Sequence, residues 1–273
     1  MDDPGEIICR WQQQSIPVAR LTVERALGST PREAGAFMLV SADGMLGTIG
    51  GGELEWQAIR QARSMLADSG GSAKLIIPLG PESGQCCGGS VSVGIECLDD
   101  EHLELAAEQL RNENIHLPVL LLFGAGHVGR ALAAALVLLP LRLIWIDSRS
   151  EEFGIVPAGI EVVSDGSWER VVAEAPPGAG ALVLTHNHAL DGVIVAELLE
   201  RGDLAYVGMI GSVTKRLRLE RGLREVGLSR DRIASLVCPI GNRGIRDKRP
   251  AVIAAFAAAE VVERLLHGKR ASL

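Results

Sequence analysis

A glycine-rich segment near the middle of the chain constrains its fold more than any other feature. Gly124, Gly126 and Gly129 follow an apolar segment at residues 119–123 and open a helical pattern at residues 127–139. Glycines at this spacing permit a tight turn, close approach of a phosphate to the backbone and close packing of helix on strand. The free N–H groups at the start of such a helix also favour an anion. The segment therefore predicts the first strand–turn–helix unit of a dinucleotide-binding fold.

The rest of the second half continues the same alternation. Apolar segments at residues 141–146, 181–184 and 205–210 alternate with helical patterns at residues 190–201, 213–226 and 251–267. Strand–helix alternation is typical of a parallel sheet with helices on both faces. Asp147 ends the second strand, 23 residues after Gly124, where an acidic side chain binds a ribose hydroxyl in such folds. We therefore expect an α/β, Rossmann-like, doubly wound parallel sheet over residues 118–273.

The N-terminal part of the chain has a different pattern. We expect strands at residues 18–26, 37–40, 75–79 and 91–98, and helices at residues 6–14 and 54–66. Asp43 and Gly44, between two apolar segments, are typical of a hairpin turn. These patterns predict a smaller α+β domain at residues 1–100. A charged connecting helix and linker at residues 101–117 follows it.

Composition and charge narrow the class of protein. Lys and Arg number 27 and Asp and Glu number 34, giving a net charge of −7, and aromatic residues make up 3%. An acidic chain with few aromatic rings is a poor candidate for binding nucleic acid. The longest apolar run, residues 131–141, contains Pro140 and is too short to span a bilayer, so no membrane partner is expected. Five cysteines and no signal-peptide pattern indicate a cytoplasmic chain with free thiols.

Two adjacent cysteines, Cys86 and Cys87, lie in a loop between glycines and next to Gln85. The glycines leave both sulfurs open to a bulky group. Neighbouring side chains of an extended segment point to opposite faces, so one thiol is expected to face any given ligand. A tight turn with two incidental thiols and a strained vicinal disulfide are the alternatives. The absence of a Cys-x-x-Cys pair argues against a structural zinc site.

Several polar residues are expected at the carboxyl edge of the parallel sheet. His127 lies in the glycine loop, and His186 and His188 follow the third strand, shortly before Asp191. In the usual strand order the first and third strands are neighbours across the switch point where ligands bind. His-x-His on an extended segment would place both rings on one face and suit a metal. Ordinary polar contacts to a ligand remain the preferred interpretation, because no third metal ligand is fixed by the spacing.

A second helix start follows the fourth strand of this half. Gly211 precedes Ser212, a good N-cap, and the helix after it carries Lys215, Arg216 and Arg218. Such a helix start attracts an anion. A solvated basic helix face is the equally favoured alternative.

Taken in order, these motifs resemble the XdhC/CoxF family, the accessory proteins of molybdenum hydroxylases such as xanthine dehydrogenase. The resemblance covers nearly the whole chain and weakens after residues 238–241, where the family's apolar continuation is replaced by a strongly basic segment at residues 242–249. The function of that basic segment is therefore left unassigned. The motifs that carry the resemblance are GSTPREAG at residues 28–35, GTIGGGELE at 47–55, LGP at 79–81, GQCCGG at 84–89, the glycine loop, THNH at 185–188 and GMIGS at 208–212.

The resemblance implies a role in cofactor maturation rather than ordinary catalysis. Family members bind the molybdenum cofactor (molybdopterin), help it receive its terminal sulfido ligand and deliver it to the apo-subunit of the hydroxylase. A cysteine desulfurase-type sulfurase is the implied second partner, and a homodimer is the expected assembly. No catalytic residue is assigned. The implied cofactor-binding residues are Arg32, Gly50, Gly51, Gly52, Gln85, Cys86, Cys87, Gly124, Gly126, His127, Gly129, Asp147, His186, His188, Gly211 and Ser212.

Each group of these residues has a physical rationale. The Cys86 thiolate is a soft donor suited to the cofactor's molybdenum, and Arg32 can pair with its phosphate through a guanidinium fork. The glycines at residues 50–52 allow close approach of the pterin or the phosphate. We expect the Cys86 loop and the carboxyl ends of the parallel strands to line one crevice.

Two rival interpretations remain open. One is an NAD(P)-dependent oxidoreductase with a nucleotide or NAD(P) at the glycine loop and His127, His186 and Asp147 in its site. The other is a pure interaction module that holds sulfurase and hydroxylase together without binding the cofactor.

Overall fold

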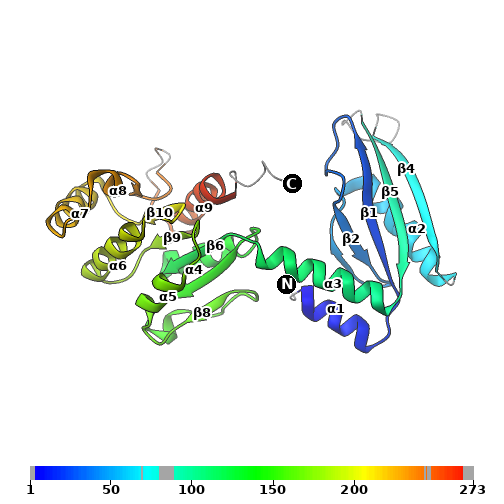
Figure 1. Ribbon diagram of the computed structural model, residues 1–273, viewed down its shortest axis with the longest axis horizontal. Helices are drawn as coiled ribbons and strands as arrows, with labels where there is room; N and C mark the ends of the chain where they lie inside the picture. Colours follow the sequence, from blue (N-terminus) through cyan, green and yellow to red (C-terminus); the bar gives the residue numbers. More distant parts are fainter. Residues whose placement is uncertain (1–3, 69, 80–88, 243, 245–246, 267–273) are drawn as a thin grey trace. The chain divides into compact units, whose positions relative to one another are not determined.

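The computed structural model describes residues 4–68, 70–79, 89–242, 244 and 247–266. The chain folds into two units, Met1–Asn112 and Glu113–Leu273 (Figure 1). Among the described residues, no helix is both long enough and apolar enough to cross a membrane.

The N-terminal unit is built on an antiparallel sheet of five strands in the order β3-β2-β1-β5-β4 (Figure 1). The strands are β1 (Val18–Leu27), β2 (Phe37–Val40), β3 (Met45–Gly47), β4 (Ser72–Leu79) and β5 (Gly89–Leu98). The Asp43-Gly44 turn joins β2 to β3 as expected, with Val40 opposite Met45. The expected strands and the antiparallel hairpin are thus confirmed.

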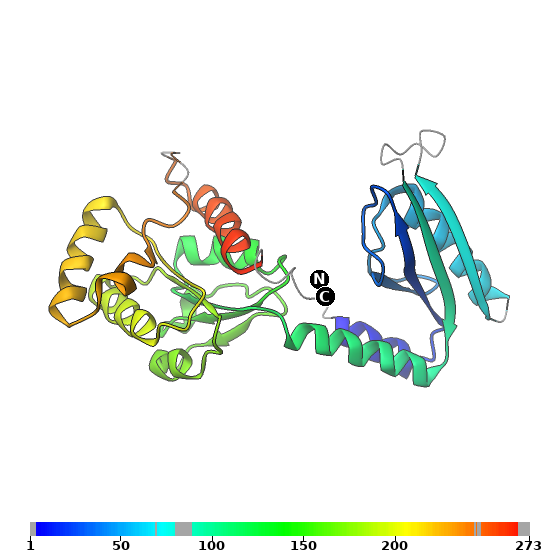
Figure 2. The ribbon, with the colours of Figure 1, turned by 45° about the horizontal axis from the view of Figure 1, so that its top comes forward.

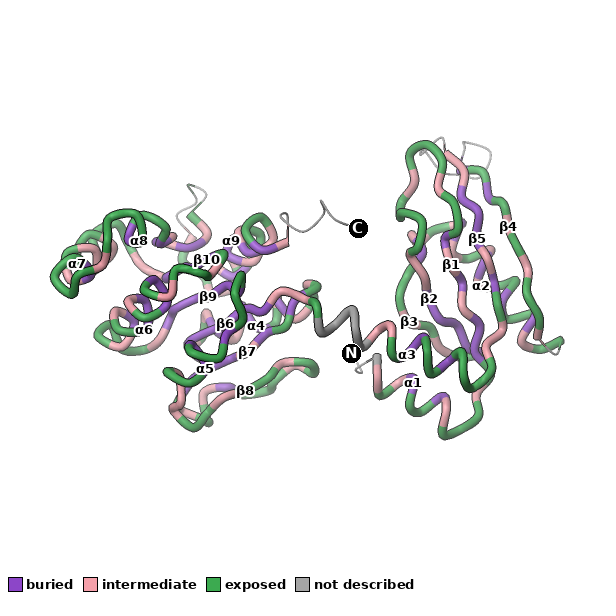
Figure 3. Tube along the Cα trace, in the orientation of Figure 1, coloured by how far each residue is buried: buried purple, intermediate pink, exposed green. Residues whose placement is uncertain are grey.

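Helices cover this sheet from two sides. Helix α2 (Gly52–Ala67) buries Leu54, Ala58 and Ala62 against one face, because residues four apart share one side of a helix. Helices α1 (Pro4–Gln13) and α3 (Asp100–Ile115) lie side by side (Figure 3). Their buried side chains form a separate apolar cluster with β2. The side chains that join α1 and α3 to that cluster include Ile8, Trp11, Leu103, Ala106 and Ala107. The first half of the charged helix that follows residue 99 is therefore part of the N-terminal core.

The C-terminal unit is built on a parallel sheet of six strands in the order β11-β10-β9-β6-β7-β8. The strands are β6 (Val119–Phe123), β7 (Arg142–Ile146), β8 (Glu161–Val163), β9 (Gly180–Val183), β10 (Tyr206–Met209) and β11 (Leu236–Val237). The helices are α4 (His127–Leu136), α5 (Trp168–Glu174), α6 (His188–Arg201), α7 (Val213–Glu225), α8 (Arg230–Ala234) and α9 (Pro250–Val261), with a 3₁₀ turn η2 (Ser150–Glu152) and a π-helical extension η3 (Val262–Leu266).

The sheet is doubly wound, as the sequence predicts. Helices α5, α6, α7 and α8 pack on one face, and α4 and α9 pack on the other (Figure 2). All five residues of β6 are buried, because its two faces are both covered. The chain reverses direction across the sheet between β6 and β9, which pair directly. The carboxyl ends of these two strands therefore form the switch point where ligands of such folds bind.

Candidate functional site

The glycine loop between β6 and α4 has the geometry that its sequence predicts. Gly124 has a φ of 115°, and a Cβ there would lie 2.3 Å from the Leu184 carbonyl oxygen on the adjacent strand segment. A Cβ on Gly129 would lie 2.0 Å from the Gly124 carbonyl oxygen. Gly126 is the N-cap of α4, and nothing lies within 4 Å of the position its Cβ would take. His127 is exposed as the first residue of α4.

The carboxylate of Asp147 sits beneath this loop, where β7 ends, and is 7% exposed. Its Oδ2 accepts hydrogen bonds from the Ala125 amide (2.8 Å) and from Nη2 of Arg149 (2.8 Å). Its Oδ1 accepts from the Arg149 amide (3.0 Å) and from Nε of Arg149 (3.0 Å). Because a carboxylate offers about four acceptor sites, these four donors saturate it. The acid is at the expected position, but its oxygens are already bound to the protein.

We expect the Asp147→Asn variant to be less stable than the wild-type chain by about 2 kcal/mol near neutral pH, the size of hydrogen bonds to a charged group. Burial raises the pKa of Asp147, but the bonds from Arg149 and Ala125 outweigh it and hold this pKa below its usual value. A depressed pKa stabilises the fold above the unfolded-state value, and that contribution is lost as the pH falls through the folded-state value.

The stability difference should therefore shrink below about pH 4, where an unfolded aspartate takes up its proton. Urea unfolding of both proteins between about pH 3 and pH 7 measures this difference. A difference that stays constant over the whole range would contradict the assigned role of the charged carboxylate.

Asp191 forms the centre of a second buried network and is 1% exposed. Its Oδ1 accepts from the amide of Thr185 (2.9 Å) and from the Thr185 hydroxyl (2.7 Å). Its Oδ2 accepts from Nζ of Lys215 (2.9 Å), and Nδ1 of His188 lies 3.5 Å away. The network ties the THNH turn after β9 to the first turn of α7. The ammonium group of Lys215 therefore binds the buried carboxylate of Asp191. From the sequence it was expected either to bind an anion or to lie on a solvated helix face.

The two histidines of the THNH motif do not lie on an extended segment, which corrects the geometry expected from the sequence. Strand β9 ends at Val183, and Asn187 caps α6 by accepting from the amides of Ala189 and Leu190. His186 therefore lies in the turn before the helix, and His188 is the first residue of α6. Within the described ranges, no group of three His, Cys, Asp or Glu side chains is placed to hold a metal ion.

The start of α7 has the cap that the sequence predicts. The Ser212 hydroxyl accepts from the Lys215 amide (3.2 Å). Gly211 adjoins a buried thiol, because a Cβ there would lie 3.0 Å from Sγ of Cys238. Burial raises the pKa of the Cys238 thiol, which disfavours the thiolate form that reacts and ligates metals.

In the N-terminal unit, the glycines before α2 form a loop whose polar groups bind a carboxylate of the same chain. Gly50, Gly51 and Gly52 have φ values of 131°, 74° and 61°. Oε2 of Glu55 accepts from the Thr48 hydroxyl (2.5 Å) and from the amides of Ile49 and Gly51 (both 3.1 Å). These two amides are therefore unavailable to an outside phosphate unless Glu55 moves away. Close approach of an uncharged part of a ligand remains compatible with the glycines.

Three motifs of the N-terminal unit meet at one end of its sheet. A Cβ on Gly50 would lie 2.5 Å from Cγ of Pro31, so the glycine loop packs against the segment that carries exposed Arg32. A Cβ on Gly89 would lie 2.3 Å from the Leu27 carbonyl oxygen, so the start of β5 adjoins the same segment.

The cysteine loop that contains Gln85, Cys86 and Cys87 lies outside the described residues, and so the crevice expected beside it stays a prediction. Its two flanking residues, Leu79 and Gly89, are paired across β4 and β5. These two flanking residues therefore lie at the end of the sheet where the Arg32 segment and the Gly50 loop meet.

Comparison with known families decides the relationship. Residues 120–261 match the family described as the XdhC Rossmann domain, and residues 11–76 match the XdhC and CoxI family. The chain belongs to the XdhC and CoxI family. The two matched segments contain the Arg32 segment, the Gly50 loop, Asp147 and Asp191, whereas the cysteine loop falls between them.

Two relatives add information on sequence and fold. The uncharacterized protein YqeB of Escherichia coli K12 is 29% identical over 259 residues, which cover 93% of this chain and 44% of that protein. This family member thus spans less than half the length of that relative. A crystal structure described as a xanthine dehydrogenase from Bacillus halodurans superimposes with a TM-score of 0.77 at 20% identity, covering 98% of this chain and 97% of the other. That likeness confirms the fold.

Proposed function

We propose that this chain is an accessory protein for maturation of molybdenum hydroxylases such as xanthine dehydrogenase. In this role it binds the molybdenum cofactor as cargo, supports its sulfuration and delivers it to the apo-enzyme. Membership of the XdhC and CoxI family supports the maturation role. The observation that carries cofactor binding is the meeting of the Arg32 segment, the Gly50 loop and the two ends of the cysteine loop at one end of the N-terminal sheet.

The chemistry of these residues suits the parts of the cargo unequally. Arg32 is exposed and offers a guanidinium fork to the phosphate. The Gly50 loop suits the pterin rather than the phosphate, because Glu55 already accepts from two of its amides. A thiolate at Cys86 offers the molybdenum a soft ligand. The proposed roles therefore assign phosphate, pterin and metal to three different motifs.

We expect Cys86→Ala to lower the molybdenum content of the purified protein roughly tenfold or more, since loss of a ligand exceeds the effect of losing an outer contact. The wild-type chain and the variant would be co-expressed with the genes for cofactor synthesis and purified without oxygen. Bound molybdenum and bound pterin would then be measured separately. Circular dichroism checks that the variant is folded.

Cys87→Ala is the matched control, because it removes the neighbouring thiol from the same loop. It should retain more molybdenum than Cys86→Ala, since adjacent side chains point to opposite faces. Equal amounts of bound molybdenum in the wild-type chain and in Cys86→Ala would show that the Cys86 sulfur does not ligate the cofactor. A larger loss in Cys87→Ala would show that the other thiol is the ligand.

The rival role of NAD(P)-dependent oxidoreductase is less well supported by the glycine loop. The ribose hydroxyls of a dinucleotide would need acceptor sites on Asp147, and its four sites are taken by Ala125 and Arg149. A ribose would have to displace the half-buried ion pair of Arg149 with Asp147, whose Nη2–Oδ2 distance is 2.8 Å. We therefore do not assign NAD(P) to this site.

The proposed partners follow from the maturation role. They are the apo-subunit of a molybdenum hydroxylase and a cysteine desulfurase-type sulfurase, with the chain itself acting as a homodimer in the cytoplasm. Size-exclusion chromatography with light scattering, run with and without each partner, tests these assemblies. A monomer that forms no complex with either partner, even when loaded with cofactor, would contradict them.

A further inference from the structure

A cavity of about 220 Å³ opens at the carboxyl ends of β6, β7 and β9, on the face covered by α5 and α6. Its apolar lining comes from four elements and consists of Phe123, Ile146, Trp168, Leu190 and Ile194. Asp147 also lines it and accepts the Ala125 amide of the glycine loop, so the cavity adjoins that loop. It therefore lies at the switch point of the sheet, where ligands of such folds bind.

The size of the cavity limits what can enter it. Pockets that enclose a whole drug-sized ligand measure roughly 300–1,000 Å³. A cavity of about 220 Å³ instead suits one ring system, with the rest of the ligand outside. The indole of Trp168 gives the lining an aromatic side chain, and aromatic rings pack favourably by stacking or edge-to-face contact. These features favour a flat ring over a branched or flexible group.

The polar groups of the lining favour nitrogen in that ring. Ser148 and His186 line the cavity and are exposed, and within the described parts of the chain no hydrogen bond engages either side chain. A hydroxyl and a neutral imidazole can each donate and accept a hydrogen bond. Thr185 contributes less, because its hydroxyl already donates to Asp191. A ring with both donor and acceptor nitrogens can use the two free groups together.

We propose that this cavity binds a fused bicyclic nitrogen heterocycle, a pterin or a purine. The phosphate-bearing part of the same ligand lies outside, toward the glycine loop and the start of α4. Because the carboxylate of Asp147 is saturated, the ring rather than a ribose supplies the specific contacts. As a pterin site, the cavity would hold the ring of the cargo at one stage of its transfer, and this reading rests on the proposed function.

Equilibrium dialysis of the cofactor-free protein tests the inference with four soluble probes. The bicyclic probes are 6-hydroxymethylpterin, GMP and AMP, and CMP is the single-ring control. We expect at least one bicyclic probe to bind more tightly than CMP. Ser148→Trp fills the cavity from an exposed position and should weaken that probe at least tenfold, because the ring loses its buried surface. His186→Ala, which removes one polar contact, should weaken it several-fold.

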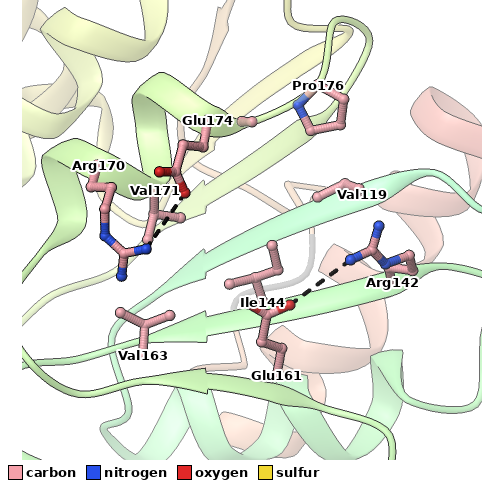
Figure 4. A pocket seen from close by; sticks show the side chains of 10 residues that line it. Val119, Arg142, Ile144, Glu161, Val163, Arg170, Val171, Glu174 and Pro176 are labelled. Atoms are coloured by element: carbon pink, nitrogen blue, oxygen red, sulfur yellow. Dashed lines mark ion pairs between the residues drawn. The ribbon is translucent and has the colours of Figure 1, made fainter. Parts of the chain in front are cut away.

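Glu174→Trp is the matched control, because it places the same bulky side chain in a different cavity. That cavity lies near the amino ends of β6 and β7 and is crossed by the ion pairs Arg142–Glu161 (3.9 Å) and Arg170–Glu174 (3.5 Å) (Figure 4). Ligands of parallel sheets bind at the opposite, carboxyl ends. Glu174→Trp should therefore leave probe affinity unchanged. Thermal unfolding checks that each variant is folded.

The probes also separate the two sources of the ring. Pterin binding assigns the cavity to the cargo, and purine binding without pterin binding assigns it to a nucleotide. No preference for any bicyclic probe over CMP, or unchanged affinity in both Ser148→Trp and His186→Ala, would overturn the inference. If the probes fail to bind but Cys86→Ala still loses molybdenum, the proposed function is retained and only the cavity inference is rejected. The two outcomes are distinguishable because the Cys86→Ala experiment measures bound metal, whereas the dialysis measures binding of the ring.

Discussion

Gly129→Ala is expected to destabilise the C-terminal unit by about 3 kcal/mol. Alanine normally stabilises a helix relative to glycine, by about 1 kcal/mol. At this position, however, a Cβ would lie 2.0 Å from the Gly124 carbonyl oxygen, and backbone on both sides of the loop would have to move. Overpacking of this kind costs roughly 1–3 kcal/mol and occasionally more. Because the neighbour is backbone rather than a flexible side chain, we expect the upper end of that range to outweigh the helix propensity. Urea unfolding measures the difference.

Gly126→Ala is the matched control from the same loop. Gly126 has a φ of −66°, and nothing lies within 4 Å of the position its Cβ would take. Loss of the glycine cap should cost less than about 1 kcal/mol. If the two variants were equally stable, the close packing of α4 on the glycine loop would not be the reason for glycine at position 129.

Asp191→Ala is expected to destabilise the same unit by about 3 kcal/mol. Removing one partner of a buried ion pair costs about 3–5 kcal/mol, because the remaining charge is left uncompensated. The side chain of Lys215 is 23% exposed and can turn partly to water, which favours the lower end of that range. Thr185 loses its acceptor at the same time, so the THNH turn should loosen as well. Urea unfolding measures the loss of unfolding free energy. Faster hydrogen exchange of the Thr185 amide would show that the THNH turn has loosened.

Two further variants isolate the contribution of the pair. Asp203→Ala removes an exposed carboxylate that pairs with Arg201 at 2.7 Å, and it should cost no more than about 1 kcal/mol. Lys215→Met in the Asp191→Ala background removes the uncompensated ammonium and should restore part of the lost stability. Additive effects of the two single substitutions would show that Asp191 and Lys215 do not act as a pair.

Elements with a strong local signal were predictable from the sequence. The strand at residues 119–123, the glycine loop and the helix at residue 127 follow from apolar continuity, glycine spacing and helical period, and all three are confirmed. Strands β8 and β11 and helices α5 and α8 were missed, because they have 3, 2, 7 and 5 residues. A periodic pattern needs about two turns or several alternations to stand out. Short elements at the edge of a sheet are fixed by packing against their neighbours instead.

The candidate site was predictable in its position but not in its bonding. The sequence placed Asp147 and the THNH motif at the carboxyl edge, where the strand order does bring them. It gave no sign that Arg149 would saturate Asp147, because an ion pair at two-residue spacing depends on a local turn. The extended His-x-His geometry was wrong, because Asn187 caps a helix at that point. Which partner a polar side chain binds depends on competition among nearby hydrogen-bond donors and acceptors, and the sequence pattern does not show which of them wins.

The sequence by itself determined the local conformations and the fold class of this protein. Glycine spacing, apolar period and turn residues act between near neighbours, and these interactions are the same wherever the segment lies. Only the tertiary structure decided that Lys215 pairs with Asp191 across 24 residues, that Glu55 fills the Gly50 loop, and that Trp168 joins β6, β7 and β9 around a cavity. The Lys215–Asp191 pair and the cavity exist only when distant segments share a sheet edge or a packed face, whereas the Glu55 bonds join near neighbours and require the particular turn that precedes α2. Their free energy then depends on burial and on the donors nearby, and these arise with the fold.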